Sequence, residues 1–264
     1  MNGIKVVHTV EAWRALRAEH RVANRIIGFV PTMGALHAGH GSLFEAARQE
    51  CDVVLASVFV NPTQFDDPRD FAKYPRVLEA DVAMMEAAGV DVAFAPSVDE
   101  MYPNGQHYTV SEEALSRELC GAHRPGHFTG VLTVVMKLLQ IAGADRAYFG
   151  EKDFQQLQLV RGMCAAFFVE TKIVGCPTVR EADGLAMSSR NARLTREQRE
   201  LAPAFHRALV EEQAAEGARA RLERLGFRVD YVEDRDGRRL GAVRLGETRL
   251  IDNVVRGMTT GASP

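Results

Sequence analysis

Short apolar runs alternate with amphipathic stretches in the first half of the chain. Runs at residues 25–30, 52–60 and 91–96 are almost wholly apolar, which is typical of strands buried on both faces of a parallel sheet. Between the last two runs, residues 75–89 predict a helix with Pro75 in its first turn, because apolar side chains recur there at helical spacing. The apolar face of this helix is predicted to hold Val77, Leu78, Val82 and Met85.

The same alternation continues further along the chain. Residues 130–143 predict a buried helix, 146–150 a strand, 153–167 a second helix and 169–177 a further strand. Strands that alternate with helices form βαβ units in a parallel sheet. We therefore expect a doubly wound, Rossmann-like α/β domain over residues 1–177.

The pattern changes after the last of these strands. The chain becomes polar and rich in arginine, and Thr195 with Gln198 predicts a capping box at the start of a new helix. A charged helix is expected to run to about Leu225, followed by two strand-like pieces at 227–233 and 241–254.

These elements predict a second, smaller α+β domain over residues 178–264. The boundary is placed at the change in composition after Pro177. The final stretch, 257–264, carries no hydrophobic pattern, and we expect it to be disordered.

Composition and charge narrow the class of protein. With 264 residues, 46% of them hydrophobic and 25% charged, the chain is typical of a globular protein with one large or two smaller domains. A net charge of -3 gives no reason to expect nucleic-acid or membrane partners, so an anionic ligand needs a local site. No apolar run is long enough to span a bilayer, and we expect a cytoplasmic protein.

Cysteine usage agrees with a reducing compartment. The four cysteines are widely spaced and contain no CxxC pair, which argues against a zinc ribbon and against a disulfide framework. They are Cys51, Cys120, Cys164 and Cys176.

The first candidate site is the stretch "PTMGALHAGH", residues 31–40, which joins a predicted strand to a predicted helix. It brings His37 and His40 to a helix N-terminus, where unpaired amides and the helix dipole favour phosphate. Imidazoles placed there would stabilise negative charge that grows during phosphoryl transfer. Two other interpretations remain open: a helix cap with a solvent-exposed partner, or a zinc pair that has no third ligand nearby in sequence.

The second candidate site is "FGEKDFQQL", residues 149–157. Lys152 follows the end of a strand and offers a point charge for phosphate, and Asp153 begins the next helix. One of Gln155 and Gln156 is expected to face the cleft. The alternative is a surface Lys–Asp pair beside a capping residue.

Further polar groups fall near the same predicted sheet edge. The stretch 184–191, "GLAMSSRN", combines two hydroxyls with an arginine, as in a loop that closes over a nucleotide, or forms a plain interdomain linker. Asn61 and Gln64 offer neutral amides for a small substrate, although Asn-Pro is also a common turn. Asp81 is a magnesium ligand or a residue at the boundary of the apolar face. Arg124 and His127 form another polar pair.

With these residues in view, the chain resembles the pantothenate synthetase (pantoate–β-alanine ligase) family. The resemblance covers about residues 28–191 and resumes near the end of the chain. The first histidine motif and the serine-rich loop also resemble the paired motifs of the nucleotidyltransferase superfamily. The motifs are "PTMGALHAGH", "FVNPTQF", "YPR", "MYPNG", "RPGHFTGVLTVV", "FGEKDFQQL", "DGLAMSSRN" and "VRLGETRLIDN".

The resemblance implies a reaction and its substrates. The family condenses D-pantoate with β-alanine, with ATP as a substrate accompanied by Mg²⁺, and releases pantothenate, AMP and pyrophosphate. The pantoate carboxylate first attacks the α-phosphate to give pantoyl adenylate, and the amine of β-alanine then displaces AMP.

The resemblance also implies site residues. It makes His40 the catalytic histidine, with His37 and Lys152 on the phosphates, and leaves open whether an imidazole donates a proton or only stabilises charge. The implied ATP site consists of Met33, Gly34, Ala35, Leu36, His37, Ala38, Gly39, His40, Gly150, Glu151, Lys152, Asp153, Val179, Met187, Ser188, Ser189 and Arg190.

Finer roles follow by the same resemblance. Asp153 would lie near the ribose, Val179 at the adenine, and the residues from Met187 onward over the triphosphate. Gln64 and Gln156 match pantoate-binding glutamines, and Gln64 also lies near the β-alanine position. The metal position corresponds to Asp81.

Three rival functions are weighed against this one. An adenylyltransferase that stops after transferring AMP to a phosphorylated acceptor would need a basic acceptor pocket, whereas the candidate amides are neutral. A regulatory nucleotide-binding protein would not need His40 and Lys152 together. An aminoacyl-tRNA synthetase is disfavoured by the slightly acidic chain and the lack of an anticodon-binding extension.

One departure from the family pattern concerns the second domain. The segment between Asn191 and the "RLIDN" motif is shorter than is usual, so we expect a shortened lid domain. By resemblance, the chain is also expected to form a homodimer through its first domain.

Overall fold

The computed structural model describes residues 3–66 and 68–256. Its contacts divide the chain into two compact units. The first unit is Met1–Glu151 with Gln155–Pro177, and the second is Lys152–Phe154 with Thr178–Pro264. The predicted disorder of 257–264 lies outside the described residues.

The first unit is built on a parallel sheet of six strands in the order β1-β4-β3-β2-β5-β6. This confirms the predicted doubly wound α/β class, since the chain order reverses within the sheet. Five strands were predicted and β1, a three-residue edge strand, was not. The strands are β1 (Lys5–Val7), β2 (Ile27–Thr32), β3 (Val53–Val58), β4 (Val92–Phe94), β5 (Arg146–Gly150) and β6 (Lys172–Cys176).

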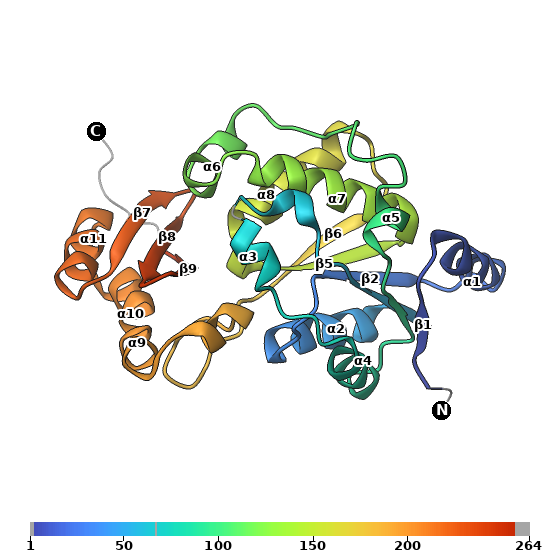
Figure 1. The fold of residues 1–264 in the computed structure, drawn as a ribbon, viewed down its shortest axis with the longest axis horizontal. Helices are drawn as coiled ribbons and strands as arrows, with labels where there is room; N and C mark the ends of the chain where they lie inside the picture. The colour runs from blue at the N-terminus through green and yellow to red at the C-terminus, as the bar shows by residue number, and fades with distance from the viewer. Residues whose placement is uncertain (1–2, 67, 257–264) are drawn as a thin grey trace, which may run out of the picture. The chain divides into compact units, whose positions relative to one another are not determined.

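Helices cover both faces of this sheet. Helices α2 (Ala38–Glu50) and α4 (Leu78–Ala87) lie on one side and α7 (His127–Ala142) on the other (Figure 1). Phe44 of α2 and Met85 of α4 are fully buried against β2 and β3 in one cluster. This packing holds α2 against the sheet, so that the N-terminus of α2 lies just beyond the carboxyl end of β2.

Several helix boundaries differ from the prediction. Helix α4 begins at Leu78, not at Pro75, and Val77 is 47% exposed and precedes the helix instead of lying on its apolar face. Helix α7 starts at His127, three residues before the predicted start, after Gly126 in a left-handed conformation. The remaining helices of this unit are α1 (Val10–Val22), α3 (Pro68–Ala72), α5 (Val98–Met101), α6 (Cys120–His123) and α8 (Phe154–Ala166), with 3-10 turns η1 (Pro62–Gln64) and η2 (Leu115–Arg117). In the 3-10 turn η3 (Glu151–Asp153), Glu151 belongs to the first unit and Lys152 and Asp153 to the second, as does Phe154, the first residue of α8.

The second unit contains an antiparallel sheet of three strands in the order β7-β8-β9. The piece predicted as one strand over 241–254 is a hairpin, because the chain turns at Gly246, where φ is +55°. The charged helix predicted to run to Leu225 is three helices, broken before Pro203 and again at Glu212. The elements are η4 (Ser189–Arg193), α9 (Arg196–Leu201), α10 (Pro203–Glu211), α11 (Ala215–Arg224), β7 (Arg228–Arg235), β8 (Arg238–Leu245) and β9 (Thr248–Val255).

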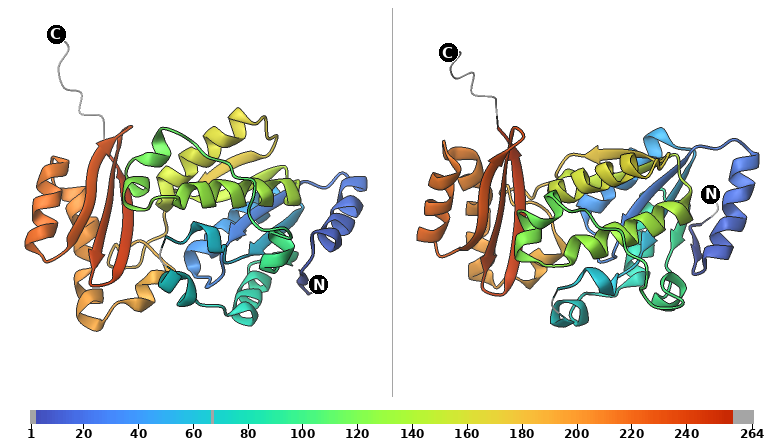
Figure 2. Two further views of the ribbon diagram at one scale, coloured as in Figure 1. Left: turned by 45° about the horizontal axis from the view of Figure 1, so that its top comes forward. Right: turned by 90° about the horizontal axis from the view of Figure 1, so that it is seen from above.

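The predicted capping box at the start of α9 is present, with Thr195 and Gln198 bonded reciprocally. Helices α10 and α11 pack on one face of the small sheet (Figure 2). Phe205 and Leu222 are buried there with Val243 in a cluster separate from that of the first unit. The second unit therefore has its own hydrophobic core.

Candidate active site

The turn between β2 and α2 has an unusual backbone. Gly34 and Ala35 both have positive φ, +78° and +52°. A Cβ on Gly34 would lie 2.7 Å from Oδ2 of Asp81, so this position needs glycine both for its conformation and for space. The turn is thereby drawn tightly against α4.

Asp81 holds the turn by its backbone. Its Oδ2 accepts from the amide of Ala35 at 3.0 Å and its Oδ1 from the amide of Leu36 at 2.8 Å. The residue is only 3% exposed, and the Tyr74 hydroxyl donates to the carbonyl of Gly34 at 3.4 Å. A buried carboxylate with two amide donors is well satisfied, so Asp81 fixes the conformation of the chain that leads to the histidines.

His37 and His40 form the N-terminal cap of α2. His37 is the N-cap residue, and its Nδ1 accepts from the amide of Gly39 at 3.1 Å. Nδ1 of His40 accepts from the amide of His37 at 3.3 Å, and the two ring centroids are 4.2 Å apart. Because an amide must donate, both Nδ1 atoms are acceptors, and each neutral ring carries its hydrogen on Nε2. One of the two histidines caps the helix, as one interpretation had it, but its partner is partly buried and belongs to the same capping box instead of being solvent-exposed. The capping bonds also fix the tautomer.

Gln64 lies beside this turn. Its Nε2 donates to Sδ of Met33 at 3.0 Å, and its Oε1 accepts from Nδ2 of Asn61 at 3.1 Å. Asn61 is itself 1% exposed and its Oδ1 accepts from the Tyr102 hydroxyl at 2.9 Å. The amide predicted to recognise substrate at position 61 is therefore occupied in orienting Gln64.

The backbone of Gln64 is held from α7. Nδ1 of His127 donates to the carbonyl of Gln64 at 2.8 Å, and Nη1 of Arg124 donates to Nε2 of the same imidazole at 3.0 Å. Arg124 also pairs with Asp66 at 2.8 Å. Burial raises the pKa of Asp66, but the charge and hydrogen bond of Arg124 outweigh it, so that pKa is lowered. Arg124 and His127, the polar pair identified in the sequence, therefore hold the backbone of Gln64 in place.

The structure distinguishes the two neighbouring glutamines at the start of α8. Gln155 is 4% exposed and bonds to three backbone groups, at Leu115, Glu118 and Cys120, so its amide is fully used. Gln156 is partly exposed. It is therefore Gln156 that is available to a substrate.

Further candidates, from Lys152 to Asp153 and from Val179 to Arg190, lie in the second unit. Lys152 has a side chain that is 18% exposed, with its Nζ 3.8 Å from Oδ2 of Asp153. Residues 179–187 form a hairpin in which the amide of Met187 donates to the carbonyl of Val179 at 3.0 Å. Beyond it, the Ser188 hydroxyl accepts from the amide of Arg190 at 3.2 Å and caps η4. The serine-rich stretch is thus an ordered turn within this unit.

A family model described as pantoate-beta-alanine ligase matches residues 5–255. The chain belongs to this family. A pantothenate synthetase from Bdellovibrio bacteriovorus is 54% identical over 244 residues, which cover 92% of this chain and 95% of the relative. Both the family resemblance and the enzyme class read from the motifs are confirmed.

Solved structures agree with this assignment. The pantothenate synthetase of Thermus thermophilus is 44% identical with a TM-score of 0.87, and the match covers 96% of this chain and 99% of that one. The pantoate–β-alanine ligase of Francisella tularensis, complexed with beta-gamma ATP and β-alanine, is 39% identical with a TM-score of 0.91, covering 96% and 97%. This ligase therefore condenses pantoate with β-alanine in an ATP-dependent reaction, as predicted from the motifs.

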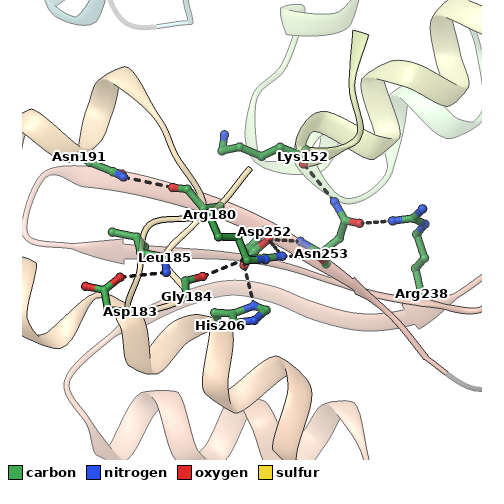
Figure 3. Close-up of polar contacts among 11 residues, drawn as sticks. Lys152, Arg180, Asp183, Gly184, Leu185, Asn191, His206, Arg238, Asp252 and Asn253 are labelled. Carbon is green, nitrogen blue, oxygen red and sulfur yellow. Dashed lines mark hydrogen bonds and ion pairs between the residues drawn. The ribbon is translucent and has the colours of Figure 1, made fainter. Parts of the chain in front are cut away.

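Sequence reasoning gave no role to a polar group in the second unit of this ligase. Arg180, Asp252, Asn253 and Arg238 bond to one another and, through Asn253, to the backbone of Lys152 (Figure 3). The available signal was the "RLIDN" motif, which carried part of the family resemblance. Motif spacing could not reveal a contact between residues 101 positions apart.

Proposed function

We propose that this ligase works through a pantoyl adenylate. A carboxylate oxygen of pantoate attacks the α-phosphorus of ATP, the bond to the β-phosphate oxygen breaks, and pyrophosphate leaves. The amine of β-alanine then attacks the acyl carbonyl, the bond to the AMP oxygen breaks, and the amine proton is lost to water. Most of the protein's contribution to the first step is positioning and stabilisation of charge.

The observation that carries the proposal is the tautomer of the two histidines. Because Nδ1 of His37 and of His40 accepts from backbone amides, the neutral rings present Nε2–H groups as donors at the start of α2. Such donors stabilise phosphoryl oxygens without giving up a proton. We propose His40 as the catalytic donor, with His37 beside it and residues 33–36 lining the same nucleotide site.

We propose that further nucleotide contacts come from around Lys152. Its ammonium would neutralise phosphate charge, and Gly150, Glu151 and Asp153 would hold the nucleotide, with Asp153 at the ribose. Val179 would contact adenine. The ordered turn at Met187, Ser188, Ser189 and Arg190 would supply hydroxyl and guanidinium donors to the triphosphate.

For the acceptor substrates we propose the two available glutamines. Gln64 is oriented by neighbours on both its side chain and its backbone, and Gln156 is partly exposed where Gln155 is buried. Both would bind pantoate, and Gln64 would also contact β-alanine. The beta-gamma ATP and β-alanine bound in the Francisella ligase support ATP and β-alanine as substrates here.

We propose that Mg²⁺ accompanies ATP near Asp81. The residues that the structure describes contain no group of three metal-ligating side chains. Magnesium at a nucleotide needs only one or two carboxylates besides phosphates and water. Each oxygen of Asp81 uses one lone pair for the backbone and keeps another. When bound, the ion would neutralise developing phosphate charge.

The magnesium proposal is tested with Asp81→Asn. We expect a lower rate and a higher magnesium concentration for half-maximal velocity. An unchanged magnesium dependence would assign Asp81 to the turn alone.

The setting of the reaction is also a proposal. We propose a cytoplasmic homodimer with small-molecule partners only, with no nucleic acid and no membrane. Four buried cysteines, none of them in a disulfide, support a reducing compartment, and the dimer is supported by the family resemblance. Within the described part of the chain, no helix has the length and apolar character needed to cross a bilayer. Light scattering on the purified protein should give twice the mass of 29.1 kDa.

The division of labour between the two units is proposed with domain bounds at 1–177 and 178–264. The first would bind pantoate and carry the histidines, and the second would act as a shortened lid. The experiment for the whole proposal is exchange of labelled pyrophosphate into ATP with pantoate present and β-alanine absent. Pantoate-dependent exchange is expected. Exchange that needs a phosphorylated acceptor instead would favour the adenylyltransferase.

A further inference from the structure

The segment Lys152–Phe154 is anchored to strand β9 and its neighbour β8. Nδ2 of Asn253 donates to the backbone carbonyl of Lys152 at 3.1 Å, and Oδ1 of Asn253 accepts from Nη1 of Arg238 at 2.7 Å. The Arg238 guanidinium lies 4.2 Å from the centre of the Phe154 ring. One asparagine side chain thus links the backbone of Lys152 to Arg238 (Figure 3). The same arginine stacks on Phe154, two positions after the lysine.

The main chain of Asn253 is held in place by hydrogen bonds to two other residues. Its amide donates to Oδ1 of Asp252 at 2.8 Å, and its carbonyl accepts from Nη2 of Arg180 at 3.2 Å. The residue is 4% exposed. An asparagine with both side-chain and both main-chain polar groups engaged has a single orientation, and it passes that orientation to Lys152.

A buried ion pair supports this asparagine. Both oxygens of Asp252 accept from Arg180, at 2.7 and 3.0 Å, and Nδ1 of His206 lies 3.2 Å from Oδ2. Burial of Asp252 raises its pKa, but the hydrogen bonds from His206 and Arg180 outweigh that effect, so the pKa lies below the ordinary value. The carboxylate is therefore charged at neutral pH, which a bidentate partner makes tolerable.

The same arginine holds the hairpin that leads to the serine-rich turn. Nη1 of Arg180 donates to the carbonyl of Gly184 at 3.1 Å. Gly184 has φ of +93°, and a Cβ there would lie 3.0 Å from Cδ2 of His206. Further along the hairpin, the carbonyl of Ala186 accepts from Nδ2 of Asn191 at 3.1 Å, which closes the turn. Arg180 and Asp252 therefore connect the two segments of the second unit that are proposed to bind phosphate.

We propose that Asn253, supported by the Asp252–Arg180 pair, is a positioning residue that sets Lys152 at a fixed distance from the turn Met187–Arg190. The lysine and the turn then meet one triphosphate in a single geometry. This inference rests on the proposed role of Lys152 at the phosphates. Asn253, Asp252 and Arg180 would not touch the substrate themselves. They would act through the backbone of Lys152, which would.

A second arginine cluster in the same unit shows what a purely structural network looks like. Arg239 is 0% exposed, pairs with Asp234 at 2.7 Å, and donates to the carbonyls of Leu209, Glu212 and Gln213. None of these groups is a predicted site residue. Asp234→Asn is therefore the matched control, because it removes a carboxylate from a buried arginine without touching the Lys152 segment.

The main test is Asn253→Asp. The new carboxylate keeps an acceptor for Arg238 but places an oxygen against the carbonyl of Lys152. A displaced lysine should lower kcat/KM for ATP roughly tenfold to hundredfold, the scale for a misplacement of about 1 Å. KM for pantoate and for β-alanine should stay unchanged. Asn253→Ala, which only deletes both bonds, serves where the aspartate variant melts below the assay temperature.

A double-mutant cycle with Lys152→Ala separates positioning from general stability. If Asn253 acts through the lysine ammonium, its substitution should change kcat/KM for ATP by less than twofold once that ammonium is gone. If the two substitutions lower kcat/KM for ATP independently, so that their effects multiply in the double variant, the inference is wrong. It is also wrong if the ATP kinetics of Asn253→Asp match those of Asp234→Asn. Full activity of Lys152→Ala alone would instead overturn the proposed role of the lysine, so the two failures are distinguishable.

Discussion

The histidine turn and the lysine segment are held in place in different ways. His37 and His40 are fixed by backbone amides within three residues of themselves, at the start of one helix. Lys152 is fixed through its carbonyl by Asn253, which lies 101 positions further along. The first is a local arrangement, and the second depends on the folding of the whole small sheet.

This difference has a consequence for mutation. A local cap is retained by any residue that offers a suitable acceptor, so chemistry and stability can be separated at the histidines. At Lys152 the side chain proposed to act on phosphate and the group that holds it belong to different residues, so the two are separated by mutating one or the other.

The largest effect is expected at His40. Glutamine at this third helical position preserves the capping box, because its side chain can accept from the amide of His37, but it lacks the imidazole Nε2–H. His40→Gln should lose turnover roughly a hundredfold or more, the scale for removing one charge-stabilising donor. Its melting temperature should stay near that of the parent.

His40→Ala is the matched comparison. It should lose the same turnover and also about 1 kcal/mol of stability, because the cap is lost as well. Steady-state kinetics and thermal unfolding on both variants check this. A glutamine variant with near-normal turnover would remove the histidine from the chemistry.

A comparable loss of rate is expected at Lys152, without the loss of stability. Lys152→Met keeps the aliphatic stem and the backbone carbonyl that Asn253 holds, and removes only the ammonium. Turnover should fall roughly a hundredfold. The melting temperature should stay unchanged, because the anchoring bond involves the backbone. A large drop in melting temperature would place the ammonium in the fold instead.

The sequence allowed much of this arrangement to be predicted. The parallel sheet followed from short apolar runs, and the histidine turn followed from two imidazoles beside glycines at a strand–helix junction. Both signals are local, so a single sequence contains them. The start of α4 shows the limit of such prediction. Pro75 suits a first helical turn, yet the helix begins at Leu78. Where a helix begins depends partly on packing against the rest of the fold, which a local sequence pattern does not contain.

The second unit was harder to predict for the same physical reason. The break between α9 and α10 and the hairpin at Gly246 depend on how helices cover a three-stranded sheet. The contacts of Asn253 join strand β9 to η3, and nothing in the spacing of either segment indicates the other. The one signal in the sequence was the family motif "RLIDN", which contains Asn253.

A smaller, pH-dependent effect is expected at Asp252. Because its folded-state pKa lies below the ordinary value of 3.8, the ionised carboxylate stabilises the fold above that pH. The stabilisation is lost as the pH falls through the folded-state pKa. Asp252→Asn should cost about 3 kcal/mol at pH 7, since it leaves Arg180 without its counter-charge.

Denaturant unfolding of both proteins between pH 5 and pH 3 checks this. The difference in free energy of unfolding should be constant at the upper end and should narrow below about pH 4. A difference that widens as the pH falls would mean that Asp252 is not held as a charged group.

The smallest effect on activity is expected at Asp234. Asp234→Asn weakens the support of Arg239, so the free energy of unfolding should fall by about 1 kcal/mol, less than at Asp252 because Asp234 is half exposed. The KM for ATP should be unchanged. An altered KM for ATP would show that any disturbance of the small sheet reaches the nucleotide, and the contrast with Asn253 would be lost.

The adenylate step is tested most directly with pantoate labelled by ¹⁸O in its carboxylate. If that carboxylate attacks the α-phosphorus, one labelled oxygen remains on phosphorus when the amine of β-alanine displaces AMP. Mass spectrometry should then find one ¹⁸O in each AMP and none in pyrophosphate. Unlabelled AMP formed alongside pantothenate would contradict a pantoyl adenylate and, with it, the role given to the histidine turn.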